Sequence, residues 1–466
     1  MKSTALNLYS RLLRDVALPA GDVFFGQQMM QRLRHLENAQ WWDRERLHAE
    51  RDRLLAKVIH GAYSSVPFYR ALMDDAGVRP QDIRKPADLT RLPIVTKDML
   101  RAGYPQRDVR PTGYKTYEVH TSGSTGKNFA VVEDTQTRGW YLASFMLSLE
   151  WSGWQIGEPH MQTGMTLHRN LPRRMKDRML RSTYISAFDL DDAHVDRALD
   201  LLDQKQIEHL WGYAASLYYF ALRAQARGWN RPLRSTVTWG DNLYPHFRQA
   251  IESAFGTTVL DTYGIGEGIQ VSAQCGCGGT YHVHTLDAIV EYLDDDGNPV
   301  PPGEPANLIL TRLHAGPMPL IRYRVGDMGI RGDQTPCPCG RGFDRMKAIL
   351  GRDTDVVVTP SGNRLIVEFF NGIVDDIPEI DSFQVIQETV DSVHVKLVPA
   401  EGYSKRTEKE LVDAMLRSGA DGLSIDIESV PEIVPIGGKR RYVISKLSPS
   451  SIPSGGVIPV KAQLTY

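Results

Sequence analysis

One loop in this sequence combines glycines, hydroxyl groups and a lysine. It runs Thr121-Ser122-Gly123-Ser124-Thr125-Gly126-Lys127. Backbone N–H groups freed by glycine can surround phosphate oxygens, and the hydroxyl and ammonium groups add further donors. The loop is not a Walker A loop, because Gly123 and Gly126 are too close together and Asn128 follows the lysine. Taken alone, it could also be an ordinary turn that binds nothing.

The cysteines are the second candidate for chemistry. The chain has only four, in two Cys-x-Cys pairs: Cys275, Cys277, Cys337 and Cys339. Four thiolates could hold one zinc ion in a tetrahedral site, and His282 or His284 could replace one of them. Nothing in the pattern keeps a coordination position open, which favours a structural zinc over a catalytic one. The alternative is four free thiols, either buried or reactive.

Polar residues also follow two predicted strands. Residues 235–239 are rich in β-branched side chains, residues 245–255 have apolar residues at helical spacing, and residues 257–260 form a second strand. This strand–helix–strand pattern predicts two parallel strands. Ligands of open α/β sheets bind beyond the carboxyl ends of such strands. We therefore expect a site at Asp241 and at the segment that runs from Tyr263 to Glu267.

The wider pattern predicts an α/β protein with two domains. We expect a large N-terminal domain with mixed or parallel sheets over residues 1–352, which begins with a helical region over residues 1–100. A small α+β domain should follow over residues 353–447, and a tail rich in Ser, Pro and Gly over residues 448–466. Apolar residues at helical spacing predict helices throughout residues 193–227.

Composition excludes several classes of protein. The 54 Lys and Arg residues against 56 Asp and Glu give a net charge of 54 − 56 = −2. This near-neutral balance without a basic block argues against a nucleic-acid partner. No apolar run approaches ~18 residues, so we expect no membrane span. Arg11, Arg14 and Asp15 interrupt any secretion signal, and we therefore expect a cytoplasmic protein.

Four further segments follow the hydroxyl-rich loop in a fixed order. They are Thr262–Glu267, Arg322–Asp327, Gly351–Asp355 and Gly437–Arg441. With the loop, they make the chain resemble the adenylate-forming superfamily of acyl-CoA synthetases and adenylation domains. It looks most like the phenylacetate–CoA ligase-like branch, which includes relatives associated with capsular polysaccharide genes. Residues 66–69 and 92–97 extend the resemblance over nearly the whole chain.

The resemblance implies where ATP and Mg²⁺ would bind. The β- and γ-phosphates would lie on Ser122, Gly123, Ser124, Thr125, Gly126 and Lys127. Glu267 would help to bind Mg²⁺, and Tyr263 with Gly264 would lie near the adenine. Asp327 would bind the ribose hydroxyls, with Arg352 beside it. Lys439, on a mobile C-terminal domain, would reach the α-phosphate and the attacking carboxylate.

Two residues depart from the family pattern. Asp241 stands where the family commonly has glutamate, and its shorter side chain could shift the contacts to nucleotide or metal. Thr354 stands at the hinge of the C-terminal domain, where the family often has aspartate or sometimes lysine. This second departure puts the domain rotation, and with it the thioester step, in question.

The implied reaction joins a carboxylic acid to AMP with loss of pyrophosphate and then transfers the acyl group to a thiol, with CoA as the expected acceptor. Transfer to an amine or to a carrier-protein thiol, and a non-catalytic nucleotide-binding homologue, are the alternatives. Trp239 and Tyr213 are candidates for the acid pocket, although aromatic residues at such positions also serve as core. In the branch, some members have a metal site of three cysteines and one histidine. The acid stays unspecified, and an acyl-carrier protein and a homodimer are possible partners.

Overall fold

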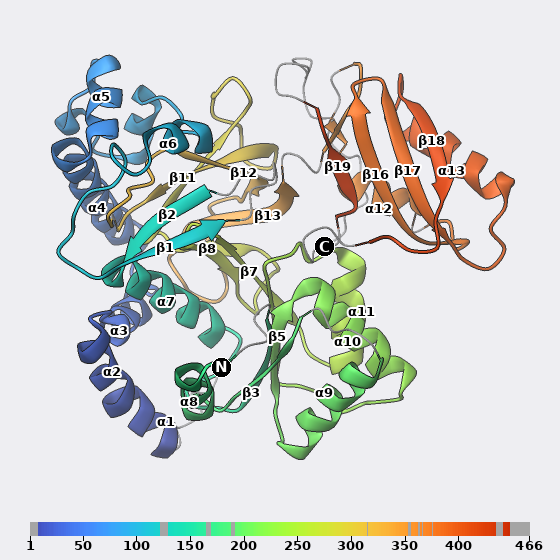
Figure 1. Ribbon diagram of the computed structural model, residues 1–466, viewed down its shortest axis with the longest axis horizontal. Helices are drawn as coiled ribbons and strands as arrows, with labels where there is room; N and C mark the ends of the chain where they lie inside the picture. Colours follow the sequence, from blue (N-terminus) through green and yellow to red (C-terminus); the bar gives the residue numbers. More distant parts are fainter. Residues whose placement is uncertain are drawn as a thin grey trace. The chain divides into compact units, whose positions relative to one another are not determined.

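A computed structural model gives the architecture of the chain (Figure 1). It describes residues 8–121, 129–164, 169–187, 192–314, 316–352, 356–361, 364–365, 367–374, 376–434 and 441–447. The chain divides into two compact units. The first unit contains Met1–Gly303, Leu308–Val325 and Arg331–Ala348, and the second contains Glu304–Asn307, Gly326–Ile330 and Ile349–Tyr466.

Helices make up most of the described chain before residue 104. They are α1 (Leu8–Leu12), the π-helix η1 (Leu13–Ala17), α2 (Leu18–Phe25), α3 (Met29–Ala39), α4 (Arg44–Ser65), α5 (Pro67–Asp75), the 3₁₀-helices η2 (Pro80–Asp82) and η3 (Pro86–Arg91), and α6 (Lys97–Gly103). Asp43 caps α4 by accepting a hydrogen bond from the backbone N–H of Arg46. Val66 ends α4 in an extended conformation because Pro67 follows it and begins α5.

An eleven-stranded sheet forms the centre of the first unit. Its strands are β3 (His160–Gly164), β4 (Ser182–Ser186), β5 (His209–Tyr213), β6 (Ser235–Trp239), β7 (Val259–Ile265), β8 (Ile269–Gln274), β9 (Tyr281–Val283), β10 (Ala288–Leu293), β11 (Pro305–Arg312), β12 (Tyr323–Arg331) and β13 (Arg345–Arg352). Their order is β10-β11-β12-β13-β9-β8-β7-β6-β5-β3-β4. Strands β4, β3, β5, β6 and β7 are parallel, whereas β7, β8, β9 and β13 pair antiparallel. The predicted mixed α/β fold is therefore confirmed, and β11, β12 and β13 each contribute a few residues to the second unit.

Helices accompany the parallel part of this sheet (Figure 1). They are α7 (Thr135–Glu150), α8 (Leu171–Met179), α9 (Asp192–Gln204), α10 (Ala214–Ala226) and α11 (Pro245–Phe255). The predicted unit of strand, helix and strand is confirmed as β6, α11 and β7. Gly256 ends α11 in the left-handed conformation, with φ of 62°.

The prediction of helices throughout residues 193–227 is wrong in its middle. Strand β5 separates α9 from α10 and pairs with both β3 and β6. Leu210 and Trp211 are buried in this strand. A short apolar run of this kind has the same periodicity in a buried strand as in a buried helix, so sequence spacing did not separate the two.

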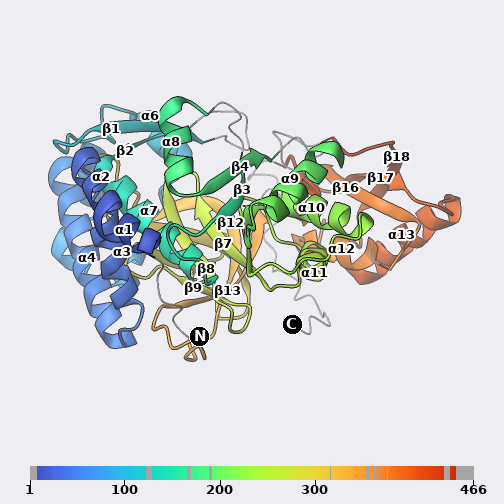
Figure 2. The same ribbon diagram turned by 90° about the horizontal axis from the view of Figure 1, so that it is seen from below.

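The second unit contains a four-stranded sheet with two helices on one face (Figures 1 and 2). Its elements are β14 (Val357–Val358), β15 (Arg364–Leu365), α12 (Val367–Val374), β16 (Ile380–Thr389), β17 (Ser392–Pro399), α13 (Lys405–Ser418), β18 (Ser424–Ser429) and β19 (Val443–Ser445). The sheet order is β18-β17-β16-β19, and only the central pair β16 and β17 is antiparallel. Thr354 and the tail 448–466 lie outside the described residues.

The main core of the first unit lies between the N-terminal helices, α7 and the sheet. Its large buried residues include Leu33, Leu147, Trp151, Trp154 and Trp211. Among the described residues, no helix has the length and apolar character needed to cross a membrane.

Candidate nucleotide and metal sites

Glu267 lies in the turn between β7 and β8, and its side chain is buried. The hydroxyl of Tyr323 donates a hydrogen bond of 2.6 Å to Oε1, and Lys97 Nζ lies 3.3 Å from the same oxygen. A buried carboxylate is costly unless it is paired, and these two partners offset that cost. Carboxylate oxygen is also the ligand type that Mg²⁺ prefers, so Glu267 fits the predicted role.

A buried ion pair holds the turn that carries Glu267. Arg312 Nη2 donates a 2.6 Å hydrogen bond to the carbonyl of Gly268 and lies 3.0 Å from Oε1 of Glu133. Gly268 has a φ of +78°, and a Cβ atom there would stand 1.9 Å from Glu133 Oε1. Only glycine therefore fits this position. Arg312 and Glu133 were not predicted from the sequence, where the available signal was a charged residue at or near the end of an otherwise apolar strand.

The carboxyl ends of β5 and β6 bring two predicted residues together. Tyr213 is the last residue of β5 and lies in register with Trp239, the last residue of β6. Asp241 follows after Gly240, and its Oδ2 accepts a 3.4 Å hydrogen bond from the N–H of Ala215 at the start of α10. A Cβ atom on Gly240 would come within 2.6 Å of the Tyr213 ring, which explains the glycine.

Aromatic residues surround this edge. Burial raises the pKa of Tyr213 to about 12, and the nearby Asp241, Tyr184 and Tyr141 raise it in the same direction. Trp239 packs edge-to-face on Phe145, with 5.6 Å between ring centroids, and both rings contact the main core. Trp239 is thus partly a core residue, and its role in an acid pocket stays a prediction.

Tyr263 and Gly264 lie in the carboxyl half of β7. Tyr263 is buried and pairs with Ser272 of β8, and the register shifts between Tyr263 and Gly264. A Cβ atom on Gly264 would stand 2.8 Å from Oε1 of Gln270. The backbone at Gly264 therefore runs close to the neighbouring strand, and the adenine role of both residues stays a prediction.

The structure brings Asp327 and Arg352 together within the second unit. Asp327 lies on β12, Arg352 is the last residue of β13, and Arg352 Nε is 3.0 Å from Asp327 Oδ1. The Asp327 side chain is buried, whereas that of Arg352 is 41% exposed. The pair fits the arrangement that the sequence analysis placed at the ribose.

The predicted phosphate loop and the predicted catalytic lysine lie outside the described residues. Strands β1 (Thr116–Thr121) and β2 (Phe129–Asp134) form an antiparallel hairpin, and Ser122 to Lys127 lie between them in the sequence. Lys439 precedes β19. Their roles stay predictions.

Three cysteines and one histidine gather in the first unit. Donor atoms of Cys275, His282, Cys337 and Cys339 all lie within 4.8 Å of one another. The Cys275 and Cys337 sulfurs are 3.6 Å apart, and Cys339 Sγ lies 3.2 Å from His282 Nε2. Burial opposes ionisation of Cys339, but hydrogen bonds from His282 and Arg341 lower its pKa to about 5. Cysteine sulfur and histidine nitrogen are the donor types that zinc prefers, so these residues fit zinc.

The two remaining candidates lie apart from this cluster. Cys277 is exposed, and its carbonyl oxygen accepts hydrogen bonds from the thiols of Cys275 and Cys337. His284 pairs with Ser148, with 2.8 Å between Nε2 and Oγ, and stacks on Trp151. The geometry therefore selects His282 rather than Cys277 or His284 as the fourth donor.

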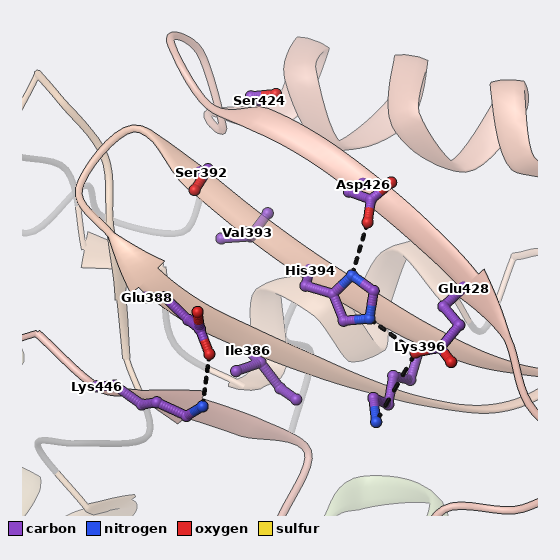
Figure 3. Close-up of a pocket in the computed structure, with 10 residues that line it drawn as sticks. All are labelled: Ile386, Glu388, Ser392, Val393, His394, Lys396, Ser424, Asp426, Glu428 and Lys446. Atoms are coloured by element: carbon purple, nitrogen blue, oxygen red, sulfur yellow. Dashed lines mark hydrogen bonds and ion pairs between the residues drawn. The ribbon is translucent and has the colours of Figure 1, made fainter.

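A shallow pocket of about 530 Å³ lies on the helix-free face of the second unit's sheet (Figure 3). His394 stands at its centre, with Nδ1 2.8 Å from Asp426 Oδ2 and Nε2 2.8 Å from Glu428 Oε2. Lys446 pairs with Glu388 at the other end of the pocket, at 2.6 Å. None of these residues belongs to the predicted sites.

Residues 357–446 match the family of the CapK C-terminal domain. The chain is 25% identical to a phenylacetate-coenzyme A ligase of Thermus thermophilus over 79% of this chain and 85% of that one. It is 29% identical to the Escherichia coli phenylacetate-coenzyme A ligase over 67% and 73% of the two chains. A crystal structure of 2-hydroxyisobutyryl-CoA ligase, in the postadenylation state with an acyl-AMP, superposes with a TM-score of 0.71 at 18% identity and covers 88% of this chain and 91% of its own.

The structural match defines the fold, which is that of the adenylate-forming ligases. The two phenylacetate-coenzyme A ligases match most of the chain in sequence. The C-terminal part also matches a family of its own. The chain is thus similar over most of its length to phenylacetate-coenzyme A ligases, and its residues 357–446 match the CapK C-terminal domain.

Proposed function

We propose that this protein is an ATP-dependent ligase that converts a carboxylic acid to an acyl-adenylate, releases pyrophosphate and then transfers the acyl group to the thiol of CoA. The observation that carries the proposal is the buried Glu267 with its partners Lys97 and Tyr323, set in an adenylate-forming fold. The relatives named above are ligases that use coenzyme A.

The chemistry needs charge stabilisation more than it needs a protein nucleophile. A carboxylate is already nucleophilic at neutral pH, but it must approach a phosphate of the same sign. In the proposal, Lys439 neutralises charge at the α-phosphate, and the donors of residues 122–127 hold the β- and γ-phosphates. Mg²⁺ held by Glu267 would supply further charge neutralisation when bound. Tyr323 and Lys97 would keep the carboxylate of Glu267 oriented toward the metal.

The zinc site is proposed as structural. Cys275, His282, Cys337 and Cys339 would use all four positions of a tetrahedral ion. Such an ion would tie the chain after β8 to the loop between β12 and β13, and its binding energy would add to folding stability.

The proposal also names the acceptor of the acyl group and the compartment in which the enzyme acts. CoA is preferred to an amine or a carrier-protein thiol because the similar Thermus thermophilus and Escherichia coli proteins, which match over most of the chain, are CoA ligases. We further propose that the enzyme acts in the cytoplasm, where ATP and CoA are available, with a small carboxylic acid as its substrate. A homodimer and a carrier-protein partner are left as outcomes of experiment.

Exchange of pyrophosphate into ATP tests the first half-reaction. The full chain is offered aryl, fatty and hydroxy acids with Mg²⁺, and at least one acid should support exchange that Lys439→Ala largely abolishes. The active acid is then offered CoA, a carrier protein and amines, and the CoA thioester should be the main product. Folded protein that supports no exchange with any acid would overturn the proposal in favour of a non-catalytic homologue.

A further inference from the structure

Helix α8 has an unusual distribution of side chains. None of its nine residues is buried, although Leu171 and Met175 lie four positions apart on one face of the helix. Their side chains are 69% and 65% exposed. A surface helix of a globular protein normally turns its apolar stripe toward the core. In α8 only Met179, at the end of the helix, packs against the main core, whereas Leu171 and Met175 face solvent.

A second segment also exposes its apolar side chains to solvent. The apolar arm, which we define as residues Leu8–Phe25, runs through α1, η1 and α2, and only Ser10 and Leu13 in it are buried. At the far end of the arm, Val23 is 86% and Phe24 81% exposed. Contiguous exposed apolar side chains of this kind mark an interaction surface.

The arm and α8 are in contact. The hydroxyl of Tyr9 donates a 2.6 Å hydrogen bond to the carbonyl of Met179, and the guanidinium of Arg181 lies over the Tyr9 ring, 5.7 Å from its centroid. Both views show α1 beside one end of α8 (Figures 1 and 2). The two exposed apolar segments are therefore neighbours in the folded chain.

Arginines flank the apolar stripe of α8. Arg174 and Arg178 lie four residues apart beside the stripe, and Arg173 and Arg181 are also exposed. None of these four has a carboxylate partner among the described residues. The acidic residue of the helix, Asp177, pairs with Arg169 instead. The surface is thus apolar and cationic at once.

This charge pattern distinguishes between possible occupants. In an isologous contact with a second copy, the arginines of α8 would face one another. The arm offers little to neutralise them, because Asp15 pairs with Arg34 and Asp22 accepts a hydrogen bond from the Met30 N–H. An anionic phospholipid surface, in contrast, offers phosphate groups to the arginines and an apolar layer just below them.

We propose that α8 and the apolar arm form a docking surface for anionic phospholipid membranes. Leu171 and Met175 enter the boundary between headgroups and acyl chains, with the apolar side chains of the arm beside them. Arg174 and Arg178 bind lipid phosphates. The contact lies on the membrane without crossing it and does not depend on the ligase reaction.

Vesicle co-sedimentation of the full chain tests the proposal. The vesicles are pure phosphatidylcholine or phosphatidylcholine with roughly one third phosphatidylglycerol, at low and at high salt. The wild type should sediment with the anionic vesicles at low salt and much less with the neutral ones. Arg174→Glu with Arg178→Glu should lower the partition coefficient by on the order of tenfold or more, and Leu171→Glu with Met175→Glu should do the same.

A charge-matched control separates this surface from general attraction. Arg406 and Lys409 are exposed on α13, and Arg406→Glu with Lys409→Glu changes the net charge by the same amount as the α8 pair. This control should bind vesicles like the wild type. Equal loss in both variants, or no vesicle binding by the folded wild type, would overturn the proposal. A wild-type dimer that Leu171→Glu with Met175→Glu converts to a monomer would assign the surface to a second copy instead.

Discussion

The turn that carries Glu267 and the Cys–His cluster both lie in the first unit, but their polar atoms have different partners. At Glu267, one carboxylate oxygen binds an ammonium group and a hydroxyl, which are single contacts that a metal or phosphate can replace or join. In the cluster, four donor atoms lie within 4.8 Å of one another, which leaves room for one ion and none for a substrate.

The two arrangements of polar partners distinguish a reactive site from a structural one. A carboxylate whose partners contact only one of its oxygens can still bind a metal ion or a substrate. Donor atoms that converge on one point are all used by a single ion and cannot bind a substrate. Changes at the first region should therefore alter rates more than stability, and changes at the second should alter stability more than rates.

The largest expected effect lies in the cluster. Cys337→Ser removes one of four donors, and because metal binding is coupled to folding we expect the melting temperature to fall on the order of 10 °C. Calorimetry with metal analysis of the purified protein measures this. Cys277→Ser is the control, since Cys277 is exposed and outside the cluster, and it should retain both zinc and stability. Wild-type protein purified without zinc would contradict the prediction.

Lys439→Ala should show the opposite behaviour. Loss of a charge-stabilising donor costs about 3–4 kcal/mol in comparable sites, so pyrophosphate exchange should fall at least ~100-fold. The melting temperature should stay unchanged. Lys446→Ala removes a lysine that pairs with Glu388 on the same unit and should leave exchange intact. Similar exchange rates in the two variants would remove Lys439 from the mechanism.

Tyr323→Phe tests the proposed Mg²⁺ ligand through its hydrogen bond. Phenylalanine keeps the buried ring against Phe129 but no longer donates to Glu267. A hydrogen bond to a charged group contributes about 1.5–3 kcal/mol, so exchange at limiting Mg²⁺ should fall about tenfold or more. Titration of Mg²⁺ at fixed ATP should show a raised half-saturation concentration. Tyr403→Phe, which removes a tyrosine–carboxylate hydrogen bond to Glu408 in the second unit, should not shift this titration.

The smallest effect is expected at the pocket of Figure 3, where the partners are exposed. Hydrogen bonds to Glu428 and Asp426 raise the pKa of His394 above its ordinary 6.5. A raised pKa means that the protonated histidine stabilises the fold below pH ~6.5, and that this contribution disappears as the pH rises through the raised value. The wild type should therefore melt slightly above His394→Gln at pH ~6 and equally at pH ~9, a difference below about 1 kcal/mol.

The pair of Lys446 and Glu388 in the same pocket provides the reference for that measurement. The hydrogen bond from Lys446 lowers the pKa of Glu388, away from neutral pH, so any stability difference of Lys446→Ala should be the same at both pH values. A difference for His394→Gln that persists at high pH would show that its packing, and not its charge, matters.

One part of the sheet edge was predictable because its residues follow strands in a regular way. The strand–helix–strand unit around α11 was read correctly, since Pro245 and Gly256 mark the two ends of its helix. The same reasoning failed at β5, where burial on both faces removes the alternation that identifies a strand. The family resemblance, and not strand spacing, placed Arg352 beside Asp327, and the two side chains form an ion pair in the structure.

The order of the motifs, the α/β class and the residue types available to bind a nucleotide and a metal could be read from the amino-acid sequence, because these depend on local spacing. The packing of distant segments selects His282 as the partner of Cys275, Cys337 and Cys339, whereas His284 contacts Ser148. It also decided that Arg312 supports the turn after Glu267 from a strand more than forty residues away. Such choices depend on which segments distant in the chain pack together, and spacing along one strand or helix carries no record of that packing.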